Sequence, residues 1–93
     1  MLMSIEEARD ILRLDGPDND TIILPLLEAI PDYLEATTGR RWDNDTVVNP
    51  LAQTAAGFIL QLWYNAQGTD TERLKRTIDN LLVALTAIGR TLK

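Results

Sequence analysis

The densest group of possible ligand atoms lies in the stretch LDGPDND, residues 14–20, which holds three aspartates and an asparagine. A twelve-residue calcium loop needs oxygen ligands at positions 1, 3 and 5, glycine at position 6 and glutamate at position 12. Counted from Asp15, position 6 is Asp20 and position 12 is Leu26, and a count from Asp18 fails at the same positions. The spacing therefore argues against a calcium loop.

A phosphate site is also a poor match for this stretch, because it has one glycine, no lysine and an excess of negative charge. A corner between two helices explains it better. Gly16 and Pro17 interrupt a helix, and the side chains of Asp18, Asn19 and Asp20 are suited to cap the free N–H groups of the next one. We therefore predict a corner that holds neither a metal nor a cofactor.

Residue types that carry most enzyme chemistry are scarce in the rest of the chain. Among 93 residues there is no cysteine and no histidine, and the only serine is Ser4. The chain thus lacks a thiolate nucleophile, the usual general base and the commonest metal ligand. Glu28, Asp32 and Glu35 form an acidic strip on one predicted helix, but a carboxylate metal site needs a facing helix that adds glutamate or histidine. We expect no enzyme activity.

Length and composition predict one soluble domain spanning residues 1–93, with 45% hydrophobic and 25% charged residues. The start, MLMSIEEAR, lacks the pattern of a signal peptide, and no apolar run has the 18 or so residues of a membrane helix. Charge is uneven, with eleven acids and four bases in residues 1–48 but two acids and five bases in residues 71–93. We expect synthesis in the cytoplasm, no membrane contact and two electrostatically different ends.

Capping residues and apolar periodicity predict an all-α domain resembling a small four-helix bundle. The first helix should begin with the capping box of Ser4 and Glu7 and end near Leu14. The second should start within residues 18–20 and end at Gly39. It is expected to be one bent helix, because it contains two prolines, Pro25 and Pro31.

The second half of the chain predicts two further helices after a connector over residues 40–48, with a possible extended piece at residues 47–48. Asn49 and Pro50 should start the third helix, which runs to Gly68. The fourth should open with a capping box of Thr69 and Glu72. Its apolar stripe is regular and must be buried: Leu74, Ile78, Leu81, Leu82, Leu85 and Ile88.

The third predicted helix is unusual because it has no charged residue over residues 50–68. One broad side suits the core: Leu51, Ala55, Phe58, Ile59, Leu62, Trp63 and Ala66. The other side is neutral and carries Gln53, Gly57, Leu60 and Tyr64. A solvent-facing side normally carries Lys and Glu, so this side is either covered within the monomer or meets another subunit.

The order of these features resembles the phage head–tail connector (adaptor) proteins, also called DNA-packaging proteins. In that family a first helix ends in a Leu-Arg-Ile/Leu-Asp turn, which residues 12–15 match. An acidic linker follows, and the next helix closes on Tyr-X-Glu-X-X-Thr-Gly-Arg, matched by residues 18–20 and 33–40. A third helix that begins after a proline and carries Trp-Tyr-Asn corresponds to Pro50 and residues 63–65.

The resemblance implies a structural subunit of a twelve-fold ring under the portal in the virion neck. Such a ring lets DNA pass without specific binding and docks a neck stopper or tail-completion protein. Together with the neutral side of the third helix, the acidic strip of residues 28–35 is then a candidate subunit interface. Arg90 and Lys93 in the basic tail are candidates for docking to the portal.

Two other classes of protein stay open. A small helical DNA-binding regulator could use Arg40, Arg41 and Trp42, but it needs a recognition helix with exposed basic and amide side chains. An acyl-carrier-like protein would carry its prosthetic group on a serine at the start of the second helix, where this chain has Thr21. Trp42 and Trp63 are expected to be core or interface anchors.

Overall fold

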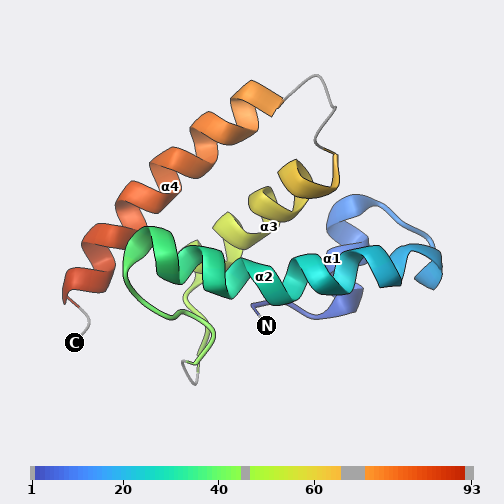
Figure 1. Ribbon diagram of the computed structural model, residues 1–93, viewed down its shortest axis with the longest axis horizontal. Coiled ribbons are helices and arrows are strands. Elements are labelled where there is room, and N and C mark those ends of the chain that lie inside the picture. The colour runs from blue at the N-terminus through green and yellow to red at the C-terminus, as the bar shows by residue number, and fades with distance from the viewer. Residues whose placement is uncertain (1, 45–46, 66–70, 92–93) are drawn as a thin grey trace.

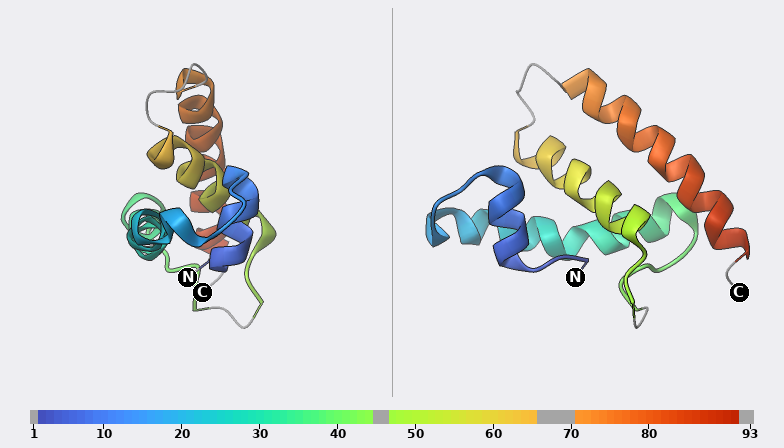
Figure 2. Two further views of the ribbon diagram at one scale, coloured as in Figure 1. Left: turned by 90° about the vertical axis from the view of Figure 1, so that its right-hand side faces the viewer. Right: turned by 180° about the vertical axis from the view of Figure 1, so that it is seen from behind.

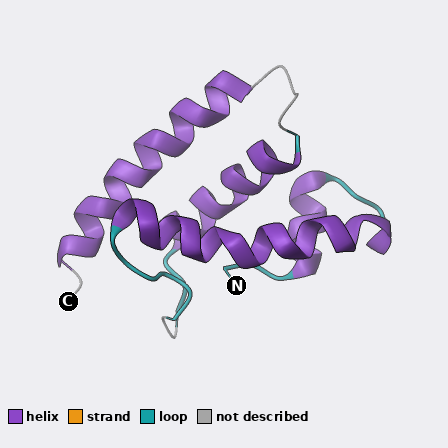
Figure 3. Ribbon diagram, in the orientation of Figure 1, coloured by secondary structure: helices purple, strands orange, loops and turns teal. Residues whose placement is uncertain are grey.

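Four α-helices and one short 3-10 helix make up most of the computed structural model, which describes residues 2–44, 47–65 and 71–91. Within these ranges there is no strand, and the loops are short (Figure 3). The all-α prediction of four helices is therefore confirmed. In chain order the elements are α1 (Ile5–Leu12), η1 (Pro17–Asn19), α2 (Asp20–Thr38), α3 (Pro50–Tyr64) and α4 (Thr71–Thr91).

The first helix begins as predicted but ends two residues early. The Glu7 backbone N–H donates to Ser4 Oγ at 3.1 Å, and the Ser4 N–H donates to Glu7 Oε1 at 3.0 Å, which completes the capping box. Helix α1 then stops at Leu12 because Arg13 adopts a left-handed conformation with φ of 59°. The next N–H, that of Leu14, closes the turn on the carbonyl of Arg9 at 2.9 Å.

The stretch LDGPDND is a corner, as predicted, but its polar side chains do not cap α2. Neither Gly16 nor Asn19, the residues before η1 and α2, makes a side-chain capping bond. The Asn19 amide instead donates to the hydroxyl of Tyr64 in α3 at 2.9 Å. Asp20 accepts from Nε of Arg9 in α1 at 3.0 Å and also pairs with its Nη2. The corner therefore uses its polar residues to join helices.

Helix α2 is continuous through Pro25 and Pro31 and ends at Thr38. The next residue is the predicted Gly39, whose φ of 84° is the left-handed value that favours glycine. The start of α3 is also as predicted, since Asn49 Oδ1 accepts from the Leu51 N–H at 2.8 Å. Its predicted end at Gly68 is wrong, because α3 stops at Tyr64. The predicted Thr69 capping box lies outside the described residues, and residues 47–48 form no strand.

The hydrophobic core lies around α3, which runs between α4 on one side and α1 and α2 on the other (Figures 1 and 2). The connector adds Trp42, which is fully buried and donates from Nε1 to Thr38 Oγ1 at 2.9 Å. Helix α4 passes close to this ring at Gly89, where a Cβ would lie at the ordinary contact distance of 3.6 Å from Trp42 Cζ2. Trp42 is thus the core anchor that joins the end of α2 to the end of α4.

The domain is flat and measures 40 × 30 × 18 Å along its principal axes. An α-helix with side chains is about 10–12 Å across, so the short dimension holds fewer than two full helix diameters. Outer helix faces therefore stay uncovered. In α4 only Ile78 and Leu85 are buried, and the remaining residues of its predicted stripe are half-buried. Among the described helices, none is long and apolar enough to cross a membrane.

Candidate assembly surface

The neutral side of α3 makes its contacts within the chain. Leu60 is fully buried, and Gly57 is buried beneath α1, where a Cβ would lie 3.4 Å from Ile11 Cδ1. At one end of the row Gln53 Nε2 donates to the Leu2 carbonyl at 3.3 Å. At the other end the Tyr64 hydroxyl accepts from the corner. Gly57 and Leu60 are thus buried within the chain, whereas Gln53 and Tyr64 at the two ends of the row are half-buried.

We expect Gly57→Leu to destabilise the isolated chain by about 1–3 kcal/mol, because the longer side chain must displace Ile11 and tilt α1 away from α3. Gly57→Ala is the matched control, since it adds only a Cβ at ordinary contact distance and improves helix propensity. Urea unfolding of both variants measures the difference. A Gly57→Leu chain as stable as the wild type would mean that α1 does not cover this side.

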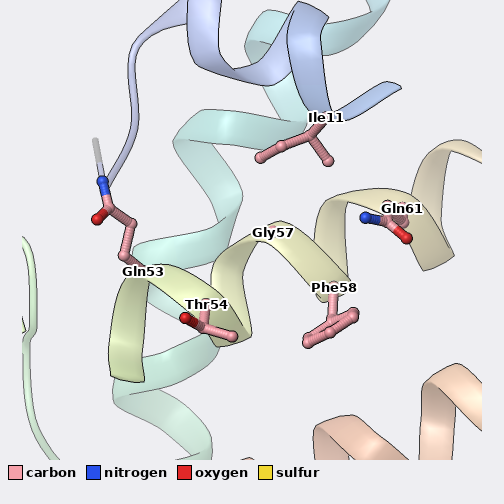
Figure 4. Close-up of a pocket in the computed structure, with 6 residues that line it drawn as sticks. All are labelled: Ile11, Gln53, Thr54, Gly57, Phe58 and Gln61. Atoms are coloured by element: carbon pink, nitrogen blue, oxygen red, sulfur yellow. The ribbon is translucent and has the colours of Figure 1, made fainter. Parts of the chain in front are cut away.

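A surface hollow of about 210 Å³ lies where α1 meets α3 (Figure 4). Ile11 faces it from α1, and the rest of its lining comes from α3: Gln53, Thr54, Gly57, Phe58 and Gln61. The lining contains no ionisable side chain, so it offers no acid, base or charged ligand. The hollow can take an apolar or amide group but has no catalytic chemistry.

The acidic strip lies on the exposed face of α2, as the sequence predicts. Glu28, Asp32 and Glu35 are all exposed, with the side chain of Asp32 at 72% and that of Glu35 at 54%. Arg41 from the connector reaches this strip, pairing with Asp32 and lying 3.7 Å from Glu35. It also binds Asp43 with two bonds of 2.8 and 3.1 Å. One guanidinium therefore serves three carboxylates, and the strip keeps net negative charge.

Two arginine–aspartate pairs shift the pKa values of their members. The hydrogen bond from Arg41 lowers the pKa of Asp43, and the bond from Arg9 lowers that of Asp20. The pKa of Arg41 is raised in return, mainly by its hydrogen bonds to Asp43 and secondly by its hydrogen bond to Asp32. The bond between Arg9 and Asp20 joins α1 to the start of α2 through an ionised carboxylate, whereas Arg41 and Asp43 both lie in the connector.

We expect the free energy of unfolding to fall as the pH drops below about 4, in part through Asp20. Its folded pKa lies below the ordinary value of 3.8, so the unfolded chain binds the proton first and acid favours unfolding. Above about pH 5 both states are ionised, and this contribution is constant. Asp20→Asn should flatten the dependence, whereas the control Asp18→Asn at an exposed position should not. Urea unfolding at a series of pH values from about 3 to 7 measures this dependence. If the free energy of unfolding changed equally with pH in the two variants, the prediction would be contradicted.

The basic end of the chain is partly described. Arg90 is exposed at the end of α4, and Lys93 lies outside the described residues. Three further bases, Arg73, Lys75 and Arg76, are exposed in the first half of α4, where Lys75 contacts Glu72 at 4.0 Å. The structure therefore places most of the described basic charge of α4 at its start, far along the helix from Arg90.

Exposed apolar side chains are the feature that the sequence analysis missed. Val83 in α4 is 71% exposed, and Ile22 and Leu24 near the start of α2 are 56% and 38% exposed. The signal was present in the helical spacing, because Val83 lies opposite the buried Ile78 and Leu85. Together with the charged residues, these side chains give α2 and α4 outer faces suited to protein contacts rather than catalysis.

Within the described ranges, no cluster of three or more acidic side chains is placed to hold a metal ion. Comparisons with protein families, with curated proteins and with solved structures found no match. The function must therefore be inferred from the chain's own residues and their arrangement.

Proposed function

We propose that this chain is a structural subunit of a phage head–tail connector, assembled as a ring of about twelve copies beneath the portal. The proposal rests on the resemblance of its sequence motifs to that family. It assigns the chain no catalytic role and no cofactor. Its partners are other copies of itself, the portal protein, and a neck stopper or tail-completion protein, and its place is the neck of the virion.

The contacts between the motifs are the observation that best supports the proposal. The acidic linker meets the Trp-Tyr motif through the bond between Asn19 and Tyr64. The closing motif of α2 meets the same pair, because the rings of Tyr33 and Trp63 form an edge-to-face contact with centroids 5.4 Å apart. Three short motifs that lie far apart in the sequence thus form one connected cluster.

Charge also suits a channel through which DNA must slide. The chain has a formal net charge of −5, and α2 carries four acids and no base. Strong binding to DNA depends on neutralising many phosphates with lysine and arginine. A ring whose subunits are net acidic does not hold the DNA, whereas a DNA-binding regulator needs the opposite balance.

Binding to the portal protein of the same phage tests this function. We expect the chain to bind, and expect binding to weaken with salt and with Arg90→Glu, because exposed ion pairs are individually weak and add up around a ring. Arg13→Glu, directly after α1, is a control for net charge, since it makes the same change of sign at another exposed position. A chain that ignores the portal and binds duplex DNA instead would favour the regulator.

A further inference from the structure

The outer faces of α2 and α4 each carry a straight line of exposed residues. Every residue of both lines is exposed, and both lines repeat at alternating spacings of three and four residues. The α2 line consists of Thr21, Pro25, Glu28, Asp32 and Glu35. The α4 line consists of Arg73, Arg76, Asn80, Val83 and Ala87. Each line spans fourteen residue steps, or about 21 Å at 1.5 Å per residue.

The two lines have complementary chemistry in opposite directions. The α2 line is uncharged at its start, where Ile22 and Leu24 flank it, and acidic at its end. The α4 line is basic at its start and apolar at its end. Placed antiparallel they match at every position, with Glu35 opposite Arg73, Asp32 opposite Arg76, Glu28 opposite Asn80, Pro25 opposite Val83, and Thr21 opposite Ala87. A parallel arrangement would put Asp32 and Glu35 against Val83 and Ala87, so charge fixes the direction.

These lines cannot pair within one chain. The buried residues Ile23 and Leu27 lie on the other side of α2, and Ile78 and Leu85 lie on the other side of α4, so both lines point away from the core. Helices α2 and α4 meet near their C-terminal ends and diverge from there with α3 between them, so their outer faces lie on different sides of the domain (Figure 1). Two different sides that fit each other produce a head-to-tail contact, which closes into a ring or continues as a filament.

We propose that the α2 line of one copy packs antiparallel on the α4 line of the next copy. This contact would be the interface between neighbouring subunits of the proposed ring. That it closes into a ring, rather than continuing as a filament, rests on the proposed function. Among the ion pairs of the described residues, Arg41 is the one base that contacts the acidic end of the α2 line, at Asp32 and Glu35. The neighbour's Arg73 and Arg76 supply further positive charge, and Val83 covers the apolar start of α2.

Cross-linking tests the direction of the contact. The 93-residue sequence has no cysteine, so introduced cysteines are the only reactive thiols. Packed helices are about 8–10 Å apart, and a bis-maleimide with a spacer of about that length suits the gap. At high protein concentration, a mixture of Thr21→Cys chains and Ala87→Cys chains should give a high yield of cross-linked dimer. Thr21→Cys mixed with Arg73→Cys, which only parallel helices bring together, should give little. Equal yields, or a reversed preference, would overturn the proposal.

Charge reversal tests the pairing without cross-links. Glu35→Arg puts a base in the last turn of α2, and Arg73→Glu puts an acid in the first turn of α4, so each change favours its own helix dipole. Each variant alone is expected to self-associate about tenfold more weakly, measured by sedimentation equilibrium. A mixture of the two should recover association, because the reversed faces fit each other. No recovery in the mixture would overturn the pairing.

The same experiments separate this contact from the connector function. Rings at the portal without the Thr21–Ala87 cross-link would mean that the function stands and this contact is wrong. The cross-link in a chain that never binds the portal would mean that the contact is right and the connector function is wrong.

Discussion

Trp42→Ala is expected to lower the free energy of unfolding by about 3–5 kcal/mol, a large share of the 5–15 kcal/mol or so that stabilises most domains. The indole is fully buried and lies under Gly89, where α4 crosses the end of α2. Its removal leaves a cavity between these helices and takes away the donor to Thr38 Oγ1. Urea unfolding followed by circular dichroism measures the loss.

Trp63→Ala is the matched control for this prediction, because Trp63 is half-buried and packs at the edge of the core. It should cost clearly less than Trp42→Ala, since less of its side chain leaves an apolar environment. If the two substitutions cost the same, or if Trp42→Ala cost less than about 1 kcal/mol, the central position of Trp42 would be refuted.

Leu60→Ala is expected to cost about 2–5 kcal/mol in the isolated chain. Leu60 has no exposed surface, although its place on the neutral side of α3 made it a candidate for a subunit contact. A residue at an interface between copies would leave the monomer's stability nearly unchanged when truncated. A chemical unfolding curve recorded at low protein concentration distinguishes the two situations.

Val83→Ala provides the comparison for Leu60, because Val83 is also apolar but is 71% exposed in α4. Its loss should change the stability of the monomer by less than about 0.5 kcal/mol. A small effect at Leu60 together with a large one at Val83 would mean that the assignment of inner and outer faces is reversed.

The starts of α1 and α3 were predictable because their signals are local. Ser4 and Glu7 cap α1, and Asn49 with Pro50 starts α3, through bonds to backbone groups within three residues. Gly39 ends α2 for an equally local reason, its positive φ. The exposure of the acidic strip also followed from the sequence, because Glu28, Asp32 and Glu35 share a helix side opposite the apolar residues.

Other features depend on tertiary contacts and could not be predicted from local sequence signals. Arg13 ends α1 in a conformation usually adopted by glycine, so no glycine marks that end. The polar side chains of Asn19 and Asp20 looked like caps, but bonds to Tyr64 and Arg9 compete successfully for them. Periodicity shows that α3 has two sides to cover, but not which neighbour covers each.

The connector function is tested most directly by an image reconstruction of the phage particle that carries this chain. We expect about twelve copies in one ring directly beneath the portal, with the α2 line of each copy against the α4 line of the next. A particle whose neck lacks this chain would contradict the proposed function.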